Sequence, residues 1–121
     1  MKWELPQLGY DYNALEPYFD AMTMEIHHSK HHQAYTDKMN GILEKYPALT
    51  ESPAELMLKL ETLPMAEADK KAFQNQGGGY LNHTLFWQNL NPTQQKNQAL
   101  SQELEQVFGS KIGRASCRER V

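Results

Sequence analysis

The residues of this chain best able to do chemistry are its histidines, which are gathered in two places. One group consists of His27, His28, His31 and His32, and the other of His83 alone. On a helix, His27, His31 and Tyr35 would form one stripe, because residues four apart share a face. We expect the adjacent stripe, His28 and His32, to pack or to hydrogen-bond to backbone. Imidazole is a common metal ligand, and two imidazoles facing each other supply half of a transition-metal site.

His83 is surrounded by apolar residues at helical spacing. The neighbours three, four and seven positions away are Tyr80, Phe86, Trp87 and Leu90, so this face must pack inward. A lone histidine on an apolar face is more often a hydrogen-bonded core residue than a ligand. The second histidine cluster, on a helix expected to face this one, reverses that preference for His83. Phe86 and Trp87 are core residues by default.

Composition excludes several classes of function. The 121 residues are 40% hydrophobic, which is enough for a core, and the net charge of -3 without a basic stripe argues against nucleic acid as a partner. No apolar run is long enough to span a membrane and no secretory signal is visible, so a cytoplasmic protein is expected. One cysteine cannot form an internal disulfide. Zinc-protease, P-loop, nucleophile-elbow and dinucleotide-binding motifs are absent from the sequence.

The first half of the sequence predicts an extended arm followed by a long helix. Proline and glycine prevent regular structure in residues 1–13, whose aromatic and leucine side chains can pack on a helical surface. Residues 14–19 are expected to form a short helical turn with Asn13 as its N-cap. A long helix is predicted over residues 20–46, because apolar residues recur at spacings of three and four until Pro47.

The next two segments are predicted to be helical as well. A helix is expected over residues 50–63, beginning with a capping box between Ser52 and Glu55. Another is expected over residues 65–90, with three consecutive glycines at 77–79. Each glycine costs about 1 kcal/mol relative to alanine in a helix. Either the helix breaks at the glycines, or a neighbour approaches the backbone closely.

The end of the chain combines a last helix with a change of composition. A helix over residues 100–108 completes an all-α fold, an antiparallel helical hairpin with a satellite helix. Residues 1–110 hold no arginine and carry a charge of -6, whereas residues 111–121 hold all three arginines and carry +3. The string IGRASCRERV at 112–121 resembles the translation of a common sequencing adapter. We therefore predict that residues 111–121 are not native and that the natural sequence is cut off near Ser110.

Two long segments resemble the amino-terminal half of the iron/manganese superoxide dismutases. They are LEPYFDAMTMEIHHSKHHQAY at residues 15–35 and GGGYLNHTLFW at residues 77–87, and the arm LPQLGYDYNALEPYFD also fits the family. The resemblance implies a helical-hairpin domain at 1–91 and the start of a truncated α/β domain at 92–110, the rest of which is missing. The implied activity is the metal-dependent disproportionation of superoxide to oxygen and hydrogen peroxide.

The resemblance also implies a role for each candidate site residue. His27 and His83 match two metal ligands of the family, whose remaining Asp and His ligands belong to the missing α/β domain. His31 and Tyr35 match the pair that gates the substrate channel and relays protons to metal-bound solvent. Trp87 matches an aromatic residue of the shell around the metal.

Gly79 bears on the choice of metal. Iron-type members often carry a glutamine at this position, whereas glycine resembles manganese-type or metal-tolerant members, so manganese is favoured and iron is the alternative. The family implies a homodimer or tetramer for the intact protein. Because the carboxylate ligand is missing, we expect the 121-residue chain alone to be inactive, metal-poor and prone to association.

Two other functions would also suit the histidines taken alone. One is a non-catalytic helical metal-binding module, in which the histidines act as a metal clip. The other is a structural helical hairpin whose histidine cluster responds to pH. The match over two long segments disfavours both.

Overall fold

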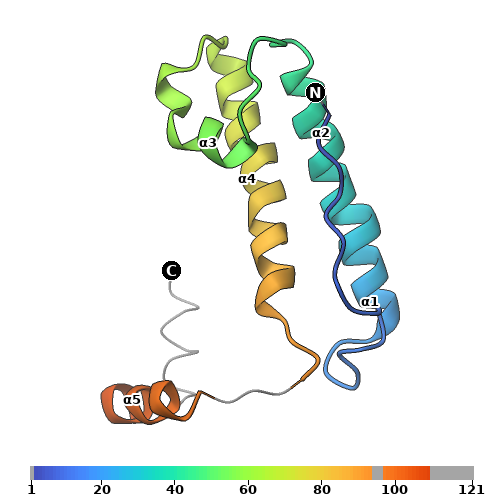
Figure 1. Ribbon diagram of the computed structural model, residues 1–121, viewed down its shortest axis with the longest axis vertical. Coiled ribbons are helices and arrows are strands. Elements are labelled where there is room, and N and C mark those ends of the chain that lie inside the picture. The colour runs from blue at the N-terminus through green and yellow to red at the C-terminus, as the bar shows by residue number, and fades with distance from the viewer. Residues whose placement is uncertain (1, 94–96, 110–121) are drawn as a thin grey trace.

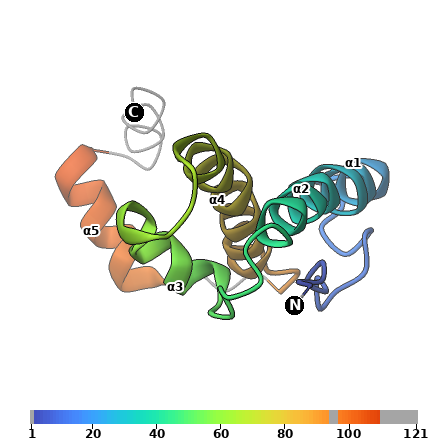
Figure 2. The ribbon, with the colours of Figure 1, turned by 90° about the horizontal axis from the view of Figure 1, so that it is seen from above.

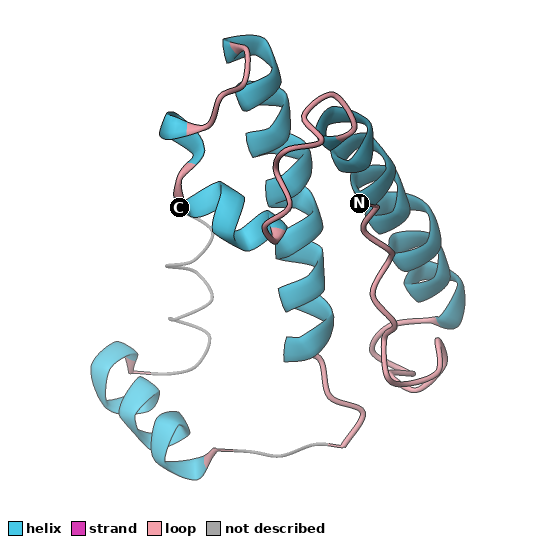
Figure 3. Ribbon diagram, turned by 45° about the horizontal axis from the view of Figure 1, so that its top comes forward, coloured by secondary structure: helices cyan, strands magenta, loops and turns pink. Residues whose placement is uncertain are grey.

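The computed structural model describes residues 2–93 and 97–109, and the regular elements among these residues are all helices, with no strand (Figure 3). The first arm of a hairpin consists of three consecutive segments, α1 (Ala21–Ile26), η1 (His27–His32) and α2 (Gln33–Leu43). The second arm, α4 (Glu67–Asn89), packs along α2 and runs antiparallel to it (Figures 1 and 2). The all-α hairpin expected from the sequence is confirmed.

The first arm begins and ends close to the predicted bounds of 20 and 46. Asp20 caps it, because its carboxylate accepts hydrogen bonds from the Thr23 N–H at 2.8 Å and the Thr23 hydroxyl at 2.9 Å. Buried side chains then recur along one stripe, namely Met24, His28, His32, Thr36, Met39, Asn40 and Leu43. This stripe has the helical period and faces the core, although four of its seven members are polar.

The middle of the first arm, η1, is a π-helical segment that the sequence did not predict. The N–H of Gln33 bonds to the carbonyl of His28, five residues earlier, so the turn holds one residue more than an α-helical turn. All four clustered histidines lie in this segment. One additional residue in a turn rotates the side chains that follow it by about 100° around the helix axis. The π-helical segment therefore determines which histidine side chains point toward α4.

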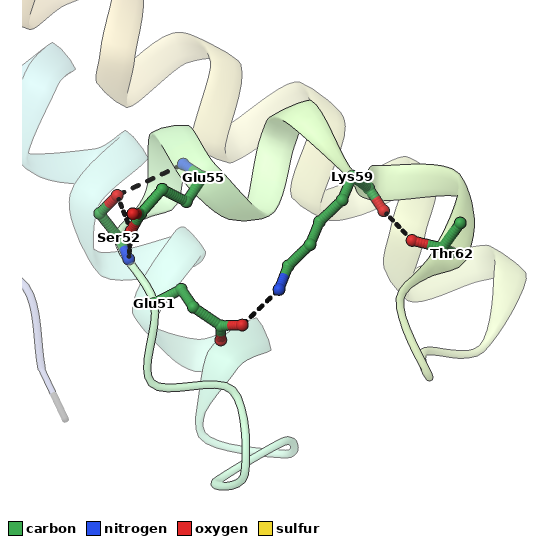
Figure 4. Close-up of polar contacts among 5 residues, drawn as sticks. All are labelled: Glu51, Ser52, Glu55, Lys59 and Thr62. Atoms are coloured by element: carbon green, nitrogen blue, oxygen red, sulfur yellow. Dashed lines mark hydrogen bonds and ion pairs between the residues drawn. The ribbon is translucent and has the colours of Figure 1, made fainter.

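The connection between the two arms contains α3 (Pro53–Leu58), which begins with the predicted capping box (Figure 4). The Ser52 hydroxyl oxygen accepts from the Glu55 N–H at 3.3 Å, and the Glu55 carboxylate accepts from the Ser52 N–H at 2.9 Å. The predicted bounds of 50–63 are wrong, because the helix ends at Leu58 and the chain then tightens into the 3₁₀ turn η2 (Leu60–Thr62).

The helix α4 passes through its three glycines without a break, and the close approach of neighbours explains two of them. A Cβ atom at Gly79 would lie 2.3 Å from a ring carbon of Tyr35, and one at Gly77 would lie 3.2 Å from the methyl carbon of Met57. Gly78 differs from both, because apart from its chain neighbours and the adjoining backbone of α4 none of the described residues comes within 4 Å of a Cβ placed there.

The core consists of two clusters separated along the hairpin. The larger one lies near the closed end and contains Met39, Ile42, Leu43, Leu56, Leu63, Met65, Phe73 and Tyr80. The smaller one lies where α1 approaches the end of α4 and contains Leu15, Met24 and Trp87. Each large side chain that is fully buried stabilises the fold by about 1.5–3 kcal/mol. The segment η1 and residue 83 lie between the two clusters and are therefore held on both sides.

The N-terminal arm runs along the first helical arm, as predicted (Figure 1). The buried amide of Asn40 pairs with the backbone of Trp3, donating to its carbonyl at 2.7 Å and accepting from its N–H at 2.8 Å. Further along, the Tyr10 hydroxyl donates to the carbonyl of Trp87 at 3.0 Å. The extended segment thus joins the two arms of the hairpin.

Other short segments give mixed outcomes. Residues 14–19 form consecutive hydrogen-bonded turns and not a regular helix, and it is the Asn13 carbonyl that accepts from the Glu16 N–H. The last predicted helix is confirmed as α5 (Gln98–Phe108). Residues 111–121, which we predict to be non-native, lie outside the described residues. No helix in the described part of the chain has the length and apolar character needed to cross a bilayer.

Candidate metal centre

Two of the predicted site residues, His27 of η1 and His83 of α4, face each other across the seam of the hairpin. Their ring centroids are 4.9 Å apart and the ring planes are perpendicular. Both side chains are half-buried. The structure therefore brings together, from opposite helices, the two imidazoles that the sequence assigned to one metal ion.

A hydrogen bond fixes which nitrogen of His83 is available to a ligand. The Nδ1 atom lies 2.8 Å from the carbonyl oxygen of Gly79, which can only accept, so Nδ1 carries the proton and donates. In the neutral ring, Nε2 then holds a free lone pair. Metal-binding histidines are commonly oriented in this way by a hydrogen bond to the other ring nitrogen.

His27 is held in its uncharged form by its surroundings. Burial, and then the neighbouring rings of His83 and His31, lower the pKa of His27 below its ordinary value of 6.5. The neutral ring is the form that binds a metal. Trp87 and Phe86 form aromatic walls, with centroids 4.8 Å and 5.5 Å from the His27 ring.

Tyr35 lies on the other side of His83, with ring centroids 5.1 Å apart. Its ring lies directly on Gly79, at a distance that leaves no room for a Cβ atom. His31 is placed differently. It is exposed, its ring meets the edge of His27 at 6.1 Å, and among the described residues no hydrogen bond joins His31 to Tyr35. The predicted relay pair is thus near the site, but its members are not joined by a hydrogen bond in the described part of the chain.

His28 and His32 are buried and hydrogen-bonded to backbone, as expected for the second stripe. His28 donates from Nε2 to the carbonyl of Pro6 at 2.7 Å, and its Nδ1 accepts from the Tyr12 hydroxyl at 3.1 Å. His28 thereby fastens the N-terminal arm to η1. His32 donates from Nε2 to the carbonyl of Tyr80 at 3.1 Å. Burial, followed by the proximity of His83, lowers the pKa of His32 to about 4.

The described residues supply only part of a metal site. No group of three or more His, Cys, Asp or Glu side chains converges among them. His27 and His31, together with Thr23 and Ile26, line an open hollow of about 380 Å³ on the first arm. The arrangement offers two imidazole rings as metal ligands, and the hollow beside His27 is open.

The family profile described as iron/manganese superoxide dismutases, alpha-hairpin domain, matches residues 2–91. The chain belongs to this family. The described fold agrees with the match, since residues 21–89 form the helical hairpin that carries both candidate ligands.

Bacterial relatives carry a similar segment within longer sequences. The chain is 50% identical over 112 residues to a protein of Haemophilus ducreyi named superoxide dismutase [Mn]. The alignment covers 91% of this chain and 51% of that protein. Proteins of the same name from Thermus aquaticus and Escherichia coli K12 are 45% and 46% identical. These alignments cover 98% and 91% of this chain, but 57% and 53% of the relatives. The chain thus spans about half the length of the curated relatives it matches.

Sequence reasoning about this dismutase hairpin missed one set of contacts at the site. The indole N–H of Trp87 donates to Nδ1 of His32 at 3.0 Å, which links the aromatic wall to the buried histidine. Nothing in the spacing of these residues shows this contact, because they are 55 positions apart. The one available signal was that His32 falls on the buried stripe of the first arm.

Proposed function

We propose that the intact dismutase to which this hairpin belongs converts superoxide to oxygen and hydrogen peroxide at a metal held partly by His27 and His83. The observation that carries the proposal is the 4.9 Å approach of these two rings from opposite helices. The family match and the names of the relatives support the reaction. They favour it over a non-catalytic metal-binding module or a pH-responsive structural hairpin.

The donor set fits a redox-active transition metal. His83 presents Nε2 because Nδ1 is occupied by the Gly79 carbonyl, and His27 is kept neutral by burial. When bound, the metal supplies the one-electron chemistry that takes an electron from one superoxide and gives it to another. The chain's own part is to hold two imidazoles in place and to exclude water on the side of Trp87, which is buried. A carboxylate ligand must come from outside the described residues.

Manganese is the metal we favour, with iron as the alternative. Gly79 lies against Tyr35 at the position where iron-type members often carry a glutamine. The relatives described above are named for manganese. Metal analysis of the intact native protein tests this choice. A fully active enzyme that contains iron and no manganese would contradict it.

Tyr35 and His31 are proposed to pass protons from solvent to the reacting oxygen. The positions of the two side chains support this proposal, because Tyr35 borders His83 and His31 is exposed beside His27. In the intact enzyme, Tyr35→Phe should slow turnover or product release while the metal content stays unchanged. Tyr46→Phe is the matched control, because the Tyr46 hydroxyl binds Asp69 at the closed end of the hairpin. Equal kinetics in wild type and Tyr35→Phe would rule the role out.

The 121-residue chain by itself is proposed to lack this activity, because two imidazoles do not complete the coordination of the metal. Superoxide-dependent activity of the purified chain, loaded with manganese or iron, would refute this statement. Assembly of the intact protein into homodimers or tetramers and its location in the cytoplasm stay predictions. The division into a hairpin at 1–91, the start of a second domain at 92–110 and a non-native tail at 111–121 is also a prediction.

A further inference from the structure

His32 occupies the centre of the seam between the two arms of the hairpin. Its side chain comes from η1, none of it is exposed, and both of its ring nitrogens bond to α4. Nδ1 lies 3.0 Å from the indole nitrogen of Trp87, and Nε2 lies 3.1 Å from the carbonyl oxygen of Tyr80. It is therefore a buried polar link between helices that are otherwise joined here by aromatic packing.

The chemistry of the partners leaves His32 a single arrangement. An indole N–H can only donate, so Nδ1 of His32 must be unprotonated and accept from Trp87. A carbonyl can only accept, so Nε2 must carry the proton and donate to Tyr80. The ring cannot rotate or change tautomer without leaving a buried group unpaired. Since the indole has one polar hydrogen, Trp87 is held in its orientation by this bond.

His32 and its partner Trp87 each border one candidate metal ligand. The His32 ring stacks on His83, with centroids 5.3 Å apart and planes 28° from parallel. The ring of Trp87, which His32 holds, meets His27 at 4.8 Å with an angle of 73°. One buried side chain thus borders one ligand and fixes the aromatic wall beside the other.

We propose that His32 is a positioning residue of the metal centre, which sets the orientation of Trp87 and, by stacking, of His83. It does not bind the metal, because both of its ring nitrogens are already occupied. The inference rests on the function proposed above for His27 and His83. The orientation of Trp87, however, can be measured without any metal.

The first experiment follows the two indole N–H signals of the metal-free chain by ¹⁵N NMR, with Trp87→Phe used to distinguish Trp87 from Trp3. In His32→Leu, the Trp87 signal should shift and its exchange with water should become faster, while the Trp3 signal stays in place. In His32→Gln, the signal should shift because an amide oxygen replaces the imidazole nitrogen, but slow exchange should be kept. This variant also serves if His32→Leu does not fold.

Met39→Ala is the control for a general loss of packing. Met39 lies on the same buried stripe, is also fully buried, and belongs to the larger core cluster away from Trp87. It should leave the Trp87 signal unchanged. The positioning role is overturned if neither His32→Leu nor His32→Gln changes the Trp87 signal. It is also overturned if Met39→Ala shifts that signal as much as the His32 substitutions do.

The second experiment measures Co²⁺ binding to the same chains from the visible absorption of the ion. Loss of a residue that orients metal ligands typically weakens affinity about 10- to 100-fold. We expect a loss in this range for His32→Leu, a smaller one for His32→Gln and none for Met39→Ala. Equal affinity of wild type and His32→Leu would overturn the effect on the ligands. The chain alone is expected to be metal-poor because the carboxylate ligand is missing, so if wild type does not bind Co²⁺ the indole signals decide whether His32 orients Trp87.

Discussion

Gly79 lies directly under the ring of Tyr35, so a single added methyl group there should disturb the candidate site. A Cβ at this position would be 2.3, 2.4 and 2.7 Å from three ring carbons of Tyr35, whereas ordinary contacts begin at 3.4 Å. In Gly79→Ala the ring must therefore move by about 1 Å, a distance at which packing energies change strongly. Because the ring borders His83, the displacement takes place beside a candidate ligand.

The neighbouring Gly78 allows the energy of this overlap to be separated from helix propensity. Alanine is favoured over glycine in a helix by about 1 kcal/mol, and Gly78→Ala should gain that amount because the described residues leave open space there. Gly79→Ala should gain the same amount but lose about 1–3 kcal/mol through overpacking. The difference between the two variants should therefore be about 1–3 kcal/mol, since the propensity term is common to both.

Urea denaturation followed by far-UV circular dichroism measures both variants in the 121-residue chain. The decisive comparison is a repeat of the pair in a Tyr35→Ala background, where the ring is absent and Gly79→Ala should stabilise as much as Gly78→Ala. If Gly79→Ala is already as stabilising as Gly78→Ala when Tyr35 is present, the ring does not lie on the glycine. The steric account of the unbroken helix would then be wrong.

Two further substitutions test the contacts that hold the hairpin in register. Asn40→Ala removes both hydrogen bonds to the backbone of Trp3 and should cost about 1–3 kcal/mol in urea denaturation, with faster proteolysis of the N-terminal arm; an unchanged midpoint would contradict this. Hydrogen bonds from Lys45, and then Tyr46, lower the pKa of Asp69 below its ordinary 3.8. The stabilisation by Asp69 is therefore present above about pH 4 and is lost as pH falls through the lowered pKa. Asp69→Asn should be less stable than wild type at pH 7, and this difference should shrink in acid; a difference independent of pH would exclude the carboxylate as its cause.

The helices of this chain could be predicted because their signals are local. Capping at Ser52, the end of the first arm before Pro47 and the apolar spacing of each arm depend on residues within a turn or two of each other. The bounds of the segment 50–63 were predicted less accurately. Its leucines suit both an α-helix and a 3₁₀ turn, and the leucine spacing does not distinguish between them.

The candidate ligands could also be predicted, but the way in which they are held could not. His83 stands out by its apolar surroundings and His27 by its place in a histidine cluster, and the family resemblance assigned them the same role. The contact of Trp87 with His32 joins residues far apart in the sequence, and it depends on the angle at which two helices cross. The glycines gave a partial signal. The sequence offered a break or a close approach, and only the structure shows that Tyr35 makes the approach at Gly79.

The histidines of η1 form two sequence pairs, His27–His28 and His31–His32, and the two members of each pair lie on different sides of the first arm. In each pair the second histidine is buried and bonded to backbone, His28 to the N-terminal arm and His32 to α4. The first member, His27 or His31, lies toward the open hollow beside the candidate site. A ligand on a helix is only as well oriented as the backbone that carries it. His27 and His31 are each followed in sequence by a buried histidine, so the π-helical turn is anchored to its neighbours at two points. This anchoring holds the His27 ring close to His83 without a metal.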